Sequence, residues 1–125
     1  MLEHEALTKA VIGCAYKVYN HMGFGFLESV YEKCMLIEIG KAGLNAKNQE
    51  AISVTYDGQV LGDYFADIVV DNKVILELKS VERLAKAHEI QLVNYLVATG
   101  ISVGLLINFG VHKVEIKRKI RELTN

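Results

Sequence analysis

Three charged residues interrupt an apolar stretch in the middle of the chain, "FADIVVDNKVILELKS" from Phe65 to Ser80. Asp67, Glu77 and Lys79 combine two carboxylates with one ammonium group. Glu77 and Lys79 lie two positions apart, so in a β-strand both side chains leave the same face of the sheet. The spacing predicts a charged patch on a sheet, provided that Asp67 joins it from a neighbouring strand.

The face on which Asp67 lies depends on the turn between the two predicted strands, because a one-residue slip in register moves every side chain to the other face. A two-residue turn would place Asp67 opposite Leu76, whereas a three-residue loop over 71–73 places it opposite Glu77. We predict the three-residue loop or an equivalent bulge. In the other register, Asp63 would take the place of Asp67.

Two carboxylates and a backbone carbonyl, such as that of Leu78, form an oxygen set that suits Mg²⁺ and leaves positions open for water and phosphate oxygens. A bound divalent ion polarises phosphate and helps to generate hydroxide at neutral pH. The Lys79 ammonium group, with an ordinary pKa of about 10.4, would stabilise negative charge that develops on the phosphate. Taken alone, the three charges also suit a surface ion-pair cluster.

Hydrophobic periodicity divides the chain into elements that would position these side chains. Helices are expected over 2–22, 27–39 and 83–99, with Gly23 and Gly100 as terminators of the first and third. Strands are expected over 47–56, 60–70, 74–79, 101–110 and 111–120, with a hairpin turn at Asp57-Gly58 and the last strand as an exposed edge. The order predicts an α/β fold in a single domain over residues 1–125, with helices packed on a mixed sheet.

Composition limits the kinds of partner that the chain can attract. Fourteen Lys and Arg against fifteen Asp and Glu give a net charge of -1, so any binding of nucleic acid must be local. The basic run over 117–121 supplies such charge, although most runs of this kind are solvated surface. Cys14 and Cys34 lack metal-binding spacing and favour buried thiols in a reducing compartment. With no apolar run of about 18 residues and a charged N-terminus, we expect a soluble, cytoplasmic protein.

Three motifs carry a resemblance to a known group of proteins. Asp67 followed by "ELK" at 77–79 resembles the D-x(n)-(D/E)-x-K signature of the PD-(D/E)XK nuclease superfamily, whose restriction-endonuclease-like αβββαβ core is similar to the predicted element order. Gln91 and Tyr95, spaced i,i+4, resemble the Q-x-x-x-Y motif of RecB-like nucleases in that superfamily. "GFLESVY" over 25–31 matches G-x-x-E-x-x-Y of the GxxExxY family. The sequence has Ala66 where proline is common.

The resemblance implies a Mg²⁺- or Mn²⁺-dependent nuclease that hydrolyses nucleic acid, DNA in preference to RNA. The implied catalytic residues are Asp67, Glu77, Lys79 and Glu28; the implied metal ligands are Asp67, Glu77, Glu28 and the Leu78 carbonyl; and Gln91 and Tyr95 would brace the site or bind phosphate. Because the chain offers little surface for gripping a duplex, a homodimer or a partner protein is expected to supply further contacts. The alternatives are a non-catalytic nucleic-acid or nucleotide-binding module and a dimeric interaction domain on the same fold.

Several of the singled-out residues also have purely structural explanations. An acid such as Glu28 is favoured near a helix N-terminus by the helix dipole. Tyr31 lies on an apolar stripe and is expected to pack, with its hydroxyl on a polar partner. His88 is expected to be an exposed helical histidine, and Gly23 and Gly25 are expected to permit the bend between the first two helices.

Overall fold

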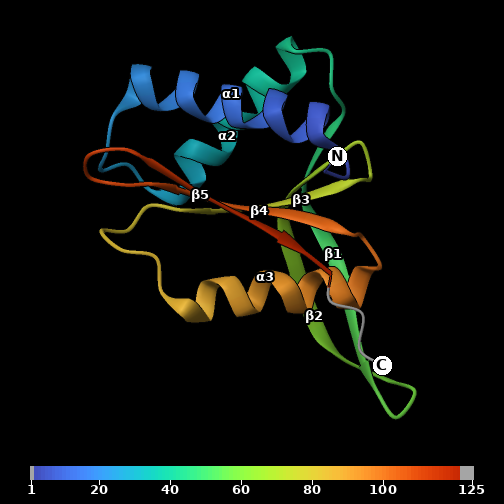
Figure 1. The fold of residues 1–125 in the computed structure, drawn as a ribbon. Helices are drawn as coiled ribbons and strands as arrows, with labels where there is room; N and C mark the ends of the chain where they lie inside the picture. Colours follow the sequence, from blue (N-terminus) through green and yellow to red (C-terminus); the bar gives the residue numbers. More distant parts are fainter. Residues whose placement is uncertain (1, 122–125) are drawn as a thin grey trace.

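The computed structural model describes residues 2–121, which form three helices and five strands in the predicted order (Figure 1). The elements are α1 (Glu5–Met22), α2 (Glu28–Lys41), β1 (Ala46–Tyr56), β2 (Gln59–Val70), β3 (Val74–Lys79), α3 (Lys86–Thr99), β4 (Val103–Phe109) and β5 (Val114–Ile120). The mixed α/β class predicted from the sequence is confirmed.

The strands form one sheet in the order β1-β2-β3-β4-β5. The first three strands are antiparallel to one another, as predicted, and β5 is antiparallel to β4 at the opposite edge. Only β3 and β4 are parallel within the described residues, and a parallel pair needs a long crossover connection. Helix α3 supplies that crossover, so the residues that follow β3 are carried onto one face of the sheet.

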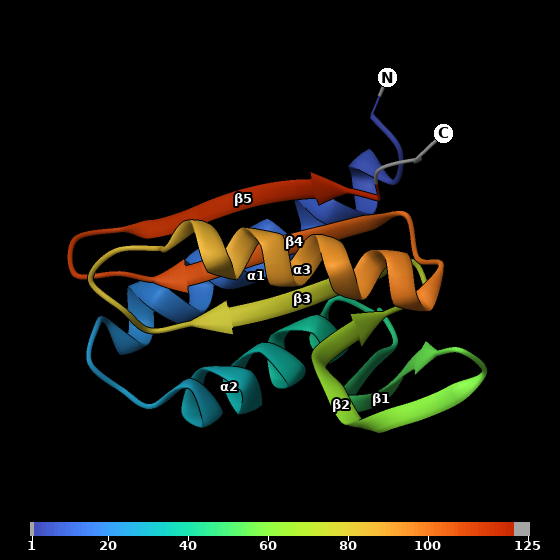
Figure 2. The ribbon, with the colours of Figure 1, turned by 90° about the horizontal axis from the view of Figure 1, so that it is seen from below.

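The helices cover both faces of the sheet (Figures 1 and 2). Helices α1 and α2 lie on one face, where Val11, Tyr31 and Met35 join a core with Leu76 and Leu105. On the other face, α3 buries its own side chains in a second, smaller core. These two hydrophobic cores fix the faces of β3, because its successive residues alternate between them.

The approach of α3 to β4 is close at Gly104. A Cβ atom at this position would lie 2.8 Å from the Cδ1 atom of Leu92, a side chain that is fully buried. Glycine therefore permits the packing distance between α3 and the sheet.

Helix α1 begins later than the sequence predicted, at Glu5 instead of Leu2. The cause is local, because His4 has a left-handed backbone with φ of 54° while its carbonyl already accepts a hydrogen bond from the Thr8 amide. The predicted terminators are confirmed, since Gly23 follows α1 and Gly100 follows α3 with φ of 70° and 76°.

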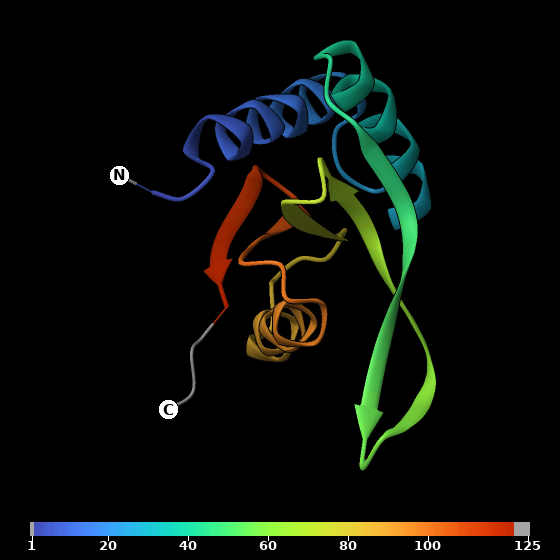
Figure 3. The same ribbon diagram turned by 90° about the vertical axis from the view of Figure 1, so that its right-hand side faces the viewer.

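Strands β1 and β2 form a long hairpin that extends beyond the rest of the sheet and runs past α3 (Figure 3). Partway along the hairpin, the strands twist so that side chains of the same parity change from one core to the other. Ile68 packs in the α1/α2 core while Ala66, two residues earlier, packs in the α3 core, and Ala46 and Ile52 show the same change of side on β1. Gln49, with φ of 50°, lies between the two halves of β1. The distal half of the hairpin therefore presents its inner face to α3.

The basic run near the C-terminus is largely engaged within the fold. Lys119 forms an ion pair with Glu89, Arg118 donates hydrogen bonds to Thr8 and to the Glu3 backbone, and Arg121 donates to the Gly100 carbonyl. These contacts favour a structural role for the run. None of the helices over residues 2–121 has the length and apolar character needed to cross a bilayer.

Candidate functional site

The loop that decides the register has three residues, as predicted. Val70 pairs with Val74, so residues 71–73 form the loop, and Asp71 and Asn72 take left-handed φ values of 51° and 56°. The same register continues through Ile68 opposite Leu76. It therefore carries Asp67 to the level of Glu77 and removes the alternative in which Asp63, exposed on the hairpin opposite Ser53, would take its place.

Strand β2 separates from β3 at Asp67. Pairing between the two strands is limited to three residue pairs among the described residues, and beyond them the Asp67 Oδ2 atom accepts a hydrogen bond of 2.8 Å from the Leu78 amide. The N–H and C=O groups of one strand residue point to the same side. The Leu78 carbonyl, predicted as a metal ligand, is thus directed into the same gap.

Glu77 is the most unusual carboxyl group of the fold. Its side chain is only 6% exposed, and its Oε1 atom is buried without a hydrogen-bond partner among the described residues. Burial, and next the negative charge of Asp67, raise the pKa of Glu77 to about 9, while Lys79 opposes them more weakly. Without a cation nearby, Glu77 therefore keeps its proton at neutral pH.

This environment fits a divalent cation. A buried carboxyl group with a free oxygen, beside a second carboxylate, would ionise readily if a cation supplied the opposite charge. Asp67, Glu77 and the Leu78 carbonyl together are the oxygen donors that Mg²⁺ prefers. The three carboxylates of Glu28, Asp67 and Glu77 do not themselves form a closed cluster, since residues 2–121 contain no group of three acidic, His or Cys side chains that could hold a metal ion.

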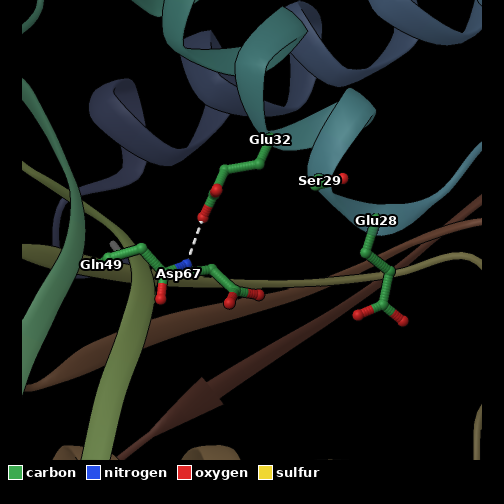
Figure 4. Close-up of a pocket in the computed structure, with 5 residues that line it drawn as sticks. All are labelled: Glu28, Ser29, Glu32, Gln49 and Asp67. Atoms are coloured by element: carbon green, nitrogen blue, oxygen red, sulfur yellow. Dashed lines mark hydrogen bonds between the residues drawn. The ribbon is translucent and has the colours of Figure 1, made fainter.

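Glu28 reaches the site from the other side of a cavity of about 200 Å³, which Asp67 also lines. Figure 4 shows Asp67 entering this cavity from β2 and Glu28 entering it from the start of α2. Glu32, one helical turn after Glu28, lines the same cavity, and its Oε1 atom accepts a hydrogen bond of 2.7 Å from Gln49 Nε2. Sequence reasoning missed Glu32 and Gln49. The i,i+4 spacing of Glu28 and Glu32 was a usable signal for Glu32.

The position of Glu28 depends on the loop that precedes α2, which Tyr31 fastens. The buried Tyr31 hydroxyl donates a hydrogen bond to the Gly23 carbonyl and accepts one of 3.3 Å from the Phe26 amide. Its ring stacks on Phe109 with 4.3 Å between ring centroids. The expectation that Tyr31 packs and finds a polar partner is confirmed.

Ser80 ties the same loop to the end of β3. Its hydroxyl donates a hydrogen bond of 2.9 Å to the Phe26 carbonyl. Since Ser80 directly follows Lys79 and Phe26 lies two residues before Glu28, this bond joins the segment that carries the lysine to the segment that carries the glutamate. The backbone positions of Lys79 and Glu28 are thus linked to each other.

Replacing Tyr31 by phenylalanine is expected to lower the free energy of unfolding by about 1–3 kcal/mol, because the Gly23 carbonyl and the Phe26 amide lose their partner while the ring remains packed. Urea denaturation followed by circular dichroism measures the change. Tyr16→Phe, on the exposed side of α1, is the matched control and should alter stability by less than about 0.5 kcal/mol. Equal stability of the two variants would contradict the fastening role of Tyr31.

Asn108 fixes the chain just beyond Lys79. It lies opposite Lys79 on β4 and is fully buried. Its Oδ1 atom accepts from the Val81 amide at 3.0 Å, and its Nδ2 atom donates to the Val81 carbonyl and to Glu115, both at 2.9 Å. Sequence reasoning missed this residue, since the only signal was one amide in an apolar strand.

The two polar residues predicted on α3 lie together. Gln91 Nε2 donates a hydrogen bond of 3.2 Å to the Tyr95 hydroxyl. Partial burial, and then the charges of Glu77 and Asp67, raise the pKa of Tyr95. His88 is helical, as predicted, but half-buried instead of exposed, and its Nδ1 atom accepts a hydrogen bond from the Ala85 amide, which caps the helix.

Comparisons with known proteins identify the family of the chain and agree with its fold. A family model described as the PD-(D/E)XK nuclease superfamily matches residues 5–119. The crystal structure of SSO0001 is similar in fold, with a TM-score of 0.59 and 16% identity, over 97% of this chain and 61% of that one. The chain thus spans about three-fifths of the length of that structure. No curated protein matches.

The family match runs from the start of α1 to the penultimate residue of β5 and so includes all of the elements that build the site. The five-stranded mixed sheet is consistent with the restriction-endonuclease-like fold. The narrower resemblances to the GxxExxY family and to the Q-x-x-x-Y motif stay predictions. The chain belongs to the PD-(D/E)XK nuclease superfamily.

Proposed function

We propose that the protein is a Mg²⁺- or Mn²⁺-dependent nuclease that hydrolyses phosphodiester bonds, with DNA as its expected substrate. The observation that carries the proposal is the buried Glu77 carboxyl group, which has a free oxygen and lies beside Asp67 where β2 leaves β3. Membership of the superfamily supports nuclease chemistry and nucleic-acid binding, and its nucleases generally use divalent metals.

Residues of β2, β3 and α2 would form the cation site. Asp67, Glu77 and the Leu78 carbonyl would hold the cation, and Glu28 faces them across the cavity. When bound, the cation supplies a polarised phosphate and an activated water. To hold the cation, Glu77 would have to release its proton to solvent.

Two further groups support this chemistry from β3 and α3. Lys79, on the same face of β3 as Glu77, would stabilise the charge that develops on the phosphate. Gln91 and Tyr95 are hydrogen-bonded to each other on α3, which covers the face of β3 that carries Glu77, and would brace the acidic pair. In this proposal the site would combine cation ligands on β2 and β3, an electrostatic stabiliser on β3 and a support on α3.

A non-catalytic nucleic-acid-binding module is the second candidate. It is favoured by the absence, within the part of the chain that the structure describes, of a closed cluster of three metal-binding side chains. On this alternative, the pocket would still accept a phosphate or a single cation, but no bond would be cleaved.

Metal dependence on a panel of substrates tests the proposal. Protein stripped with EDTA is incubated with end-labelled single-stranded and double-stranded DNA and RNA, with Mg²⁺, Mn²⁺ or EDTA. We expect metal-dependent cleavage that co-elutes with the protein on size-exclusion chromatography, and light scattering on the same fractions tests the proposed homodimer. Binding without cleavage in both metals would support the non-catalytic module, and neither binding nor cleavage would show that the proposed function is wrong.

A further inference from the structure

A second hollow lies on the other side of the site from the acidic cavity. It is a groove of about 530 Å³ between the distal part of the β1–β2 hairpin and α3, which we call the hairpin–α3 groove. Its walls include Val54, Tyr64, Ile90, Gln91, Asn94 and Tyr95. The volume lies in the range of small-molecule pockets.

The turnover of the hairpin creates this groove. Tyr64 lies directly opposite Ile52, which is buried in the α3 core, so both side chains are on the face turned toward α3. The Tyr64 side chain is nevertheless 41% exposed, and Ile90 on the facing helix is 53% exposed. An aromatic ring and an aliphatic wall thus stand open to solvent on two sides of one hollow.

The groove is continuous with the site through Tyr95. This residue lines the groove and packs against the α3 core, and Glu77 lies on the face of β3 that this core covers. None of the described residues that line the groove is acidic, whereas Glu28, Glu32 and Asp67 line the cavity on the α2 side. The α2 side therefore needs a cation before it can accept phosphate, and the α3 side offers neutral, partly apolar surface.

We propose that the hairpin–α3 groove binds an unpaired nucleobase next to the phosphate that is cleaved, with the base stacked on Tyr64 and its edge within reach of the Gln91 and Asn94 amides. The proposal rests on the proposed nuclease function and names its substrate class as single-stranded nucleic acid. Every base has a face that can stack on an aromatic ring, so the groove would be tolerant of sequence. Amide side chains both donate and accept hydrogen bonds, as base edges require.

A base inside a duplex cannot use this groove, because its two faces are already stacked on its neighbours. The groove would receive a base only from an unpaired strand, and the adjoining phosphate would then lie beside Tyr95, toward the acidic pair. We therefore expect the protein to prefer single-stranded nucleic acid, because the groove, Tyr95 and the acidic pair follow one another in this order.

Fluorescence anisotropy with labelled oligothymidylate and with a blunt hairpin duplex tests the inference, in Ca²⁺ to limit cleavage. Tyr64→Ala is expected to weaken binding of the single strand by about 5- to 100-fold, whereas Tyr64→Phe, which keeps the ring, should stay within about 2-fold of wild type. Tyr56→Ala is the matched control, since Tyr56 is 74% exposed at the far end of the same hairpin and outside the groove. Ile90→Glu, an exposed change that should not affect folding, is expected to weaken binding as well.

The outcomes separate this inference from the proposed function. Wild-type cleavage of nucleic acid together with an unchanged affinity of Tyr64→Ala, or with tighter binding of the duplex, would overturn the groove assignment and leave the nuclease in place. Dissociation of a dimer by Tyr64→Ala and Ile90→Glu, with unchanged affinity for the single strand, would show that a second copy occupies the groove instead. Absence of cleavage and binding in the wild type would overturn both proposals.

Discussion

Replacing Lys79 by alanine is expected to lower the rate of DNA hydrolysis by about 10²- to 10³-fold, the usual effect of removing one preorganised electrostatic stabiliser of a transition state. Lys79 is half-buried at the end of β3, on the face that carries Glu77, and Asn108 and Ser80 fix the backbone that follows it. The backbone that carries its ammonium group is therefore fixed before substrate arrives. Single-turnover rates at saturating protein measure the chemical step directly.

Lys73→Ala is the matched control for this measurement. Lys73 is exposed in the loop at the opposite end of the same strand, so its removal changes the net charge equally without touching the site. We expect wild-type rates within about 2-fold for this variant, because surface charges far from the chemistry act only through screened, long-range fields. Equal losses in both variants would mean that Lys79 acts only through overall charge.

The second large effect concerns stability in the absence of metal. The folded protein holds the Glu77 proton up to a pKa of about 9, whereas the unfolded chain releases it near 4.5. Between these values the native state binds more protons than the unfolded state, so the free energy of unfolding must fall as pH rises. One proton sets the limit of this slope at about 1.4 kcal/mol per pH unit.

Glu77→Gln is expected to remove this slope, because glutamine imitates the protonated acid at every pH. Urea denaturation in EDTA from pH 5 to pH 9 measures it, with Glu82→Gln as the control, since Glu82 is exposed just after β3. Mg²⁺ should stabilise the wild type increasingly toward high pH, because a cation binds the ionised carboxylate. A Glu77→Gln protein with the wild-type slope would show that another group holds the proton.

The register of the site could be predicted because two independent signals agreed. The apolar alternation on β2 and β3 fixes which residues face the α1/α2 core, and the loop at 71–73 is the connection that keeps those faces aligned while placing Asp67 at the level of Glu77. The first two loop residues are Asp and Asn, which tolerate left-handed backbone well. The residues of the two strands and of the loop between them were therefore sufficient to predict that Asp67 lies at the level of Glu77.

The surroundings of the pair depend on contacts that the local sequence does not encode. Glutamine gives no sign that Gln49 will adopt a positive φ, so the turnover of the hairpin and the groove beside α3 could not be foreseen. The role of Asn108 is apparent only from its hydrogen bonds to Val81, which lies 27 residues earlier in the chain. The Glu32 side chain is oriented by a hydrogen bond from Gln49, and β1 brings that glutamine to it from 17 residues later in the chain.

The amide of Asn108 binds both the N–H and the C=O of Val81, which is what a neighbouring strand would do. The side chain thereby extends the sheet by one residue after β3 has ended and isolates Lys79 from the connection that leads to α3. The backbone of the lysine is consequently held by the sheet itself, and Leu84 and Ala85 are held separately by α3 and its core. The reaction centre and the entry into α3 are therefore anchored by different parts of the fold.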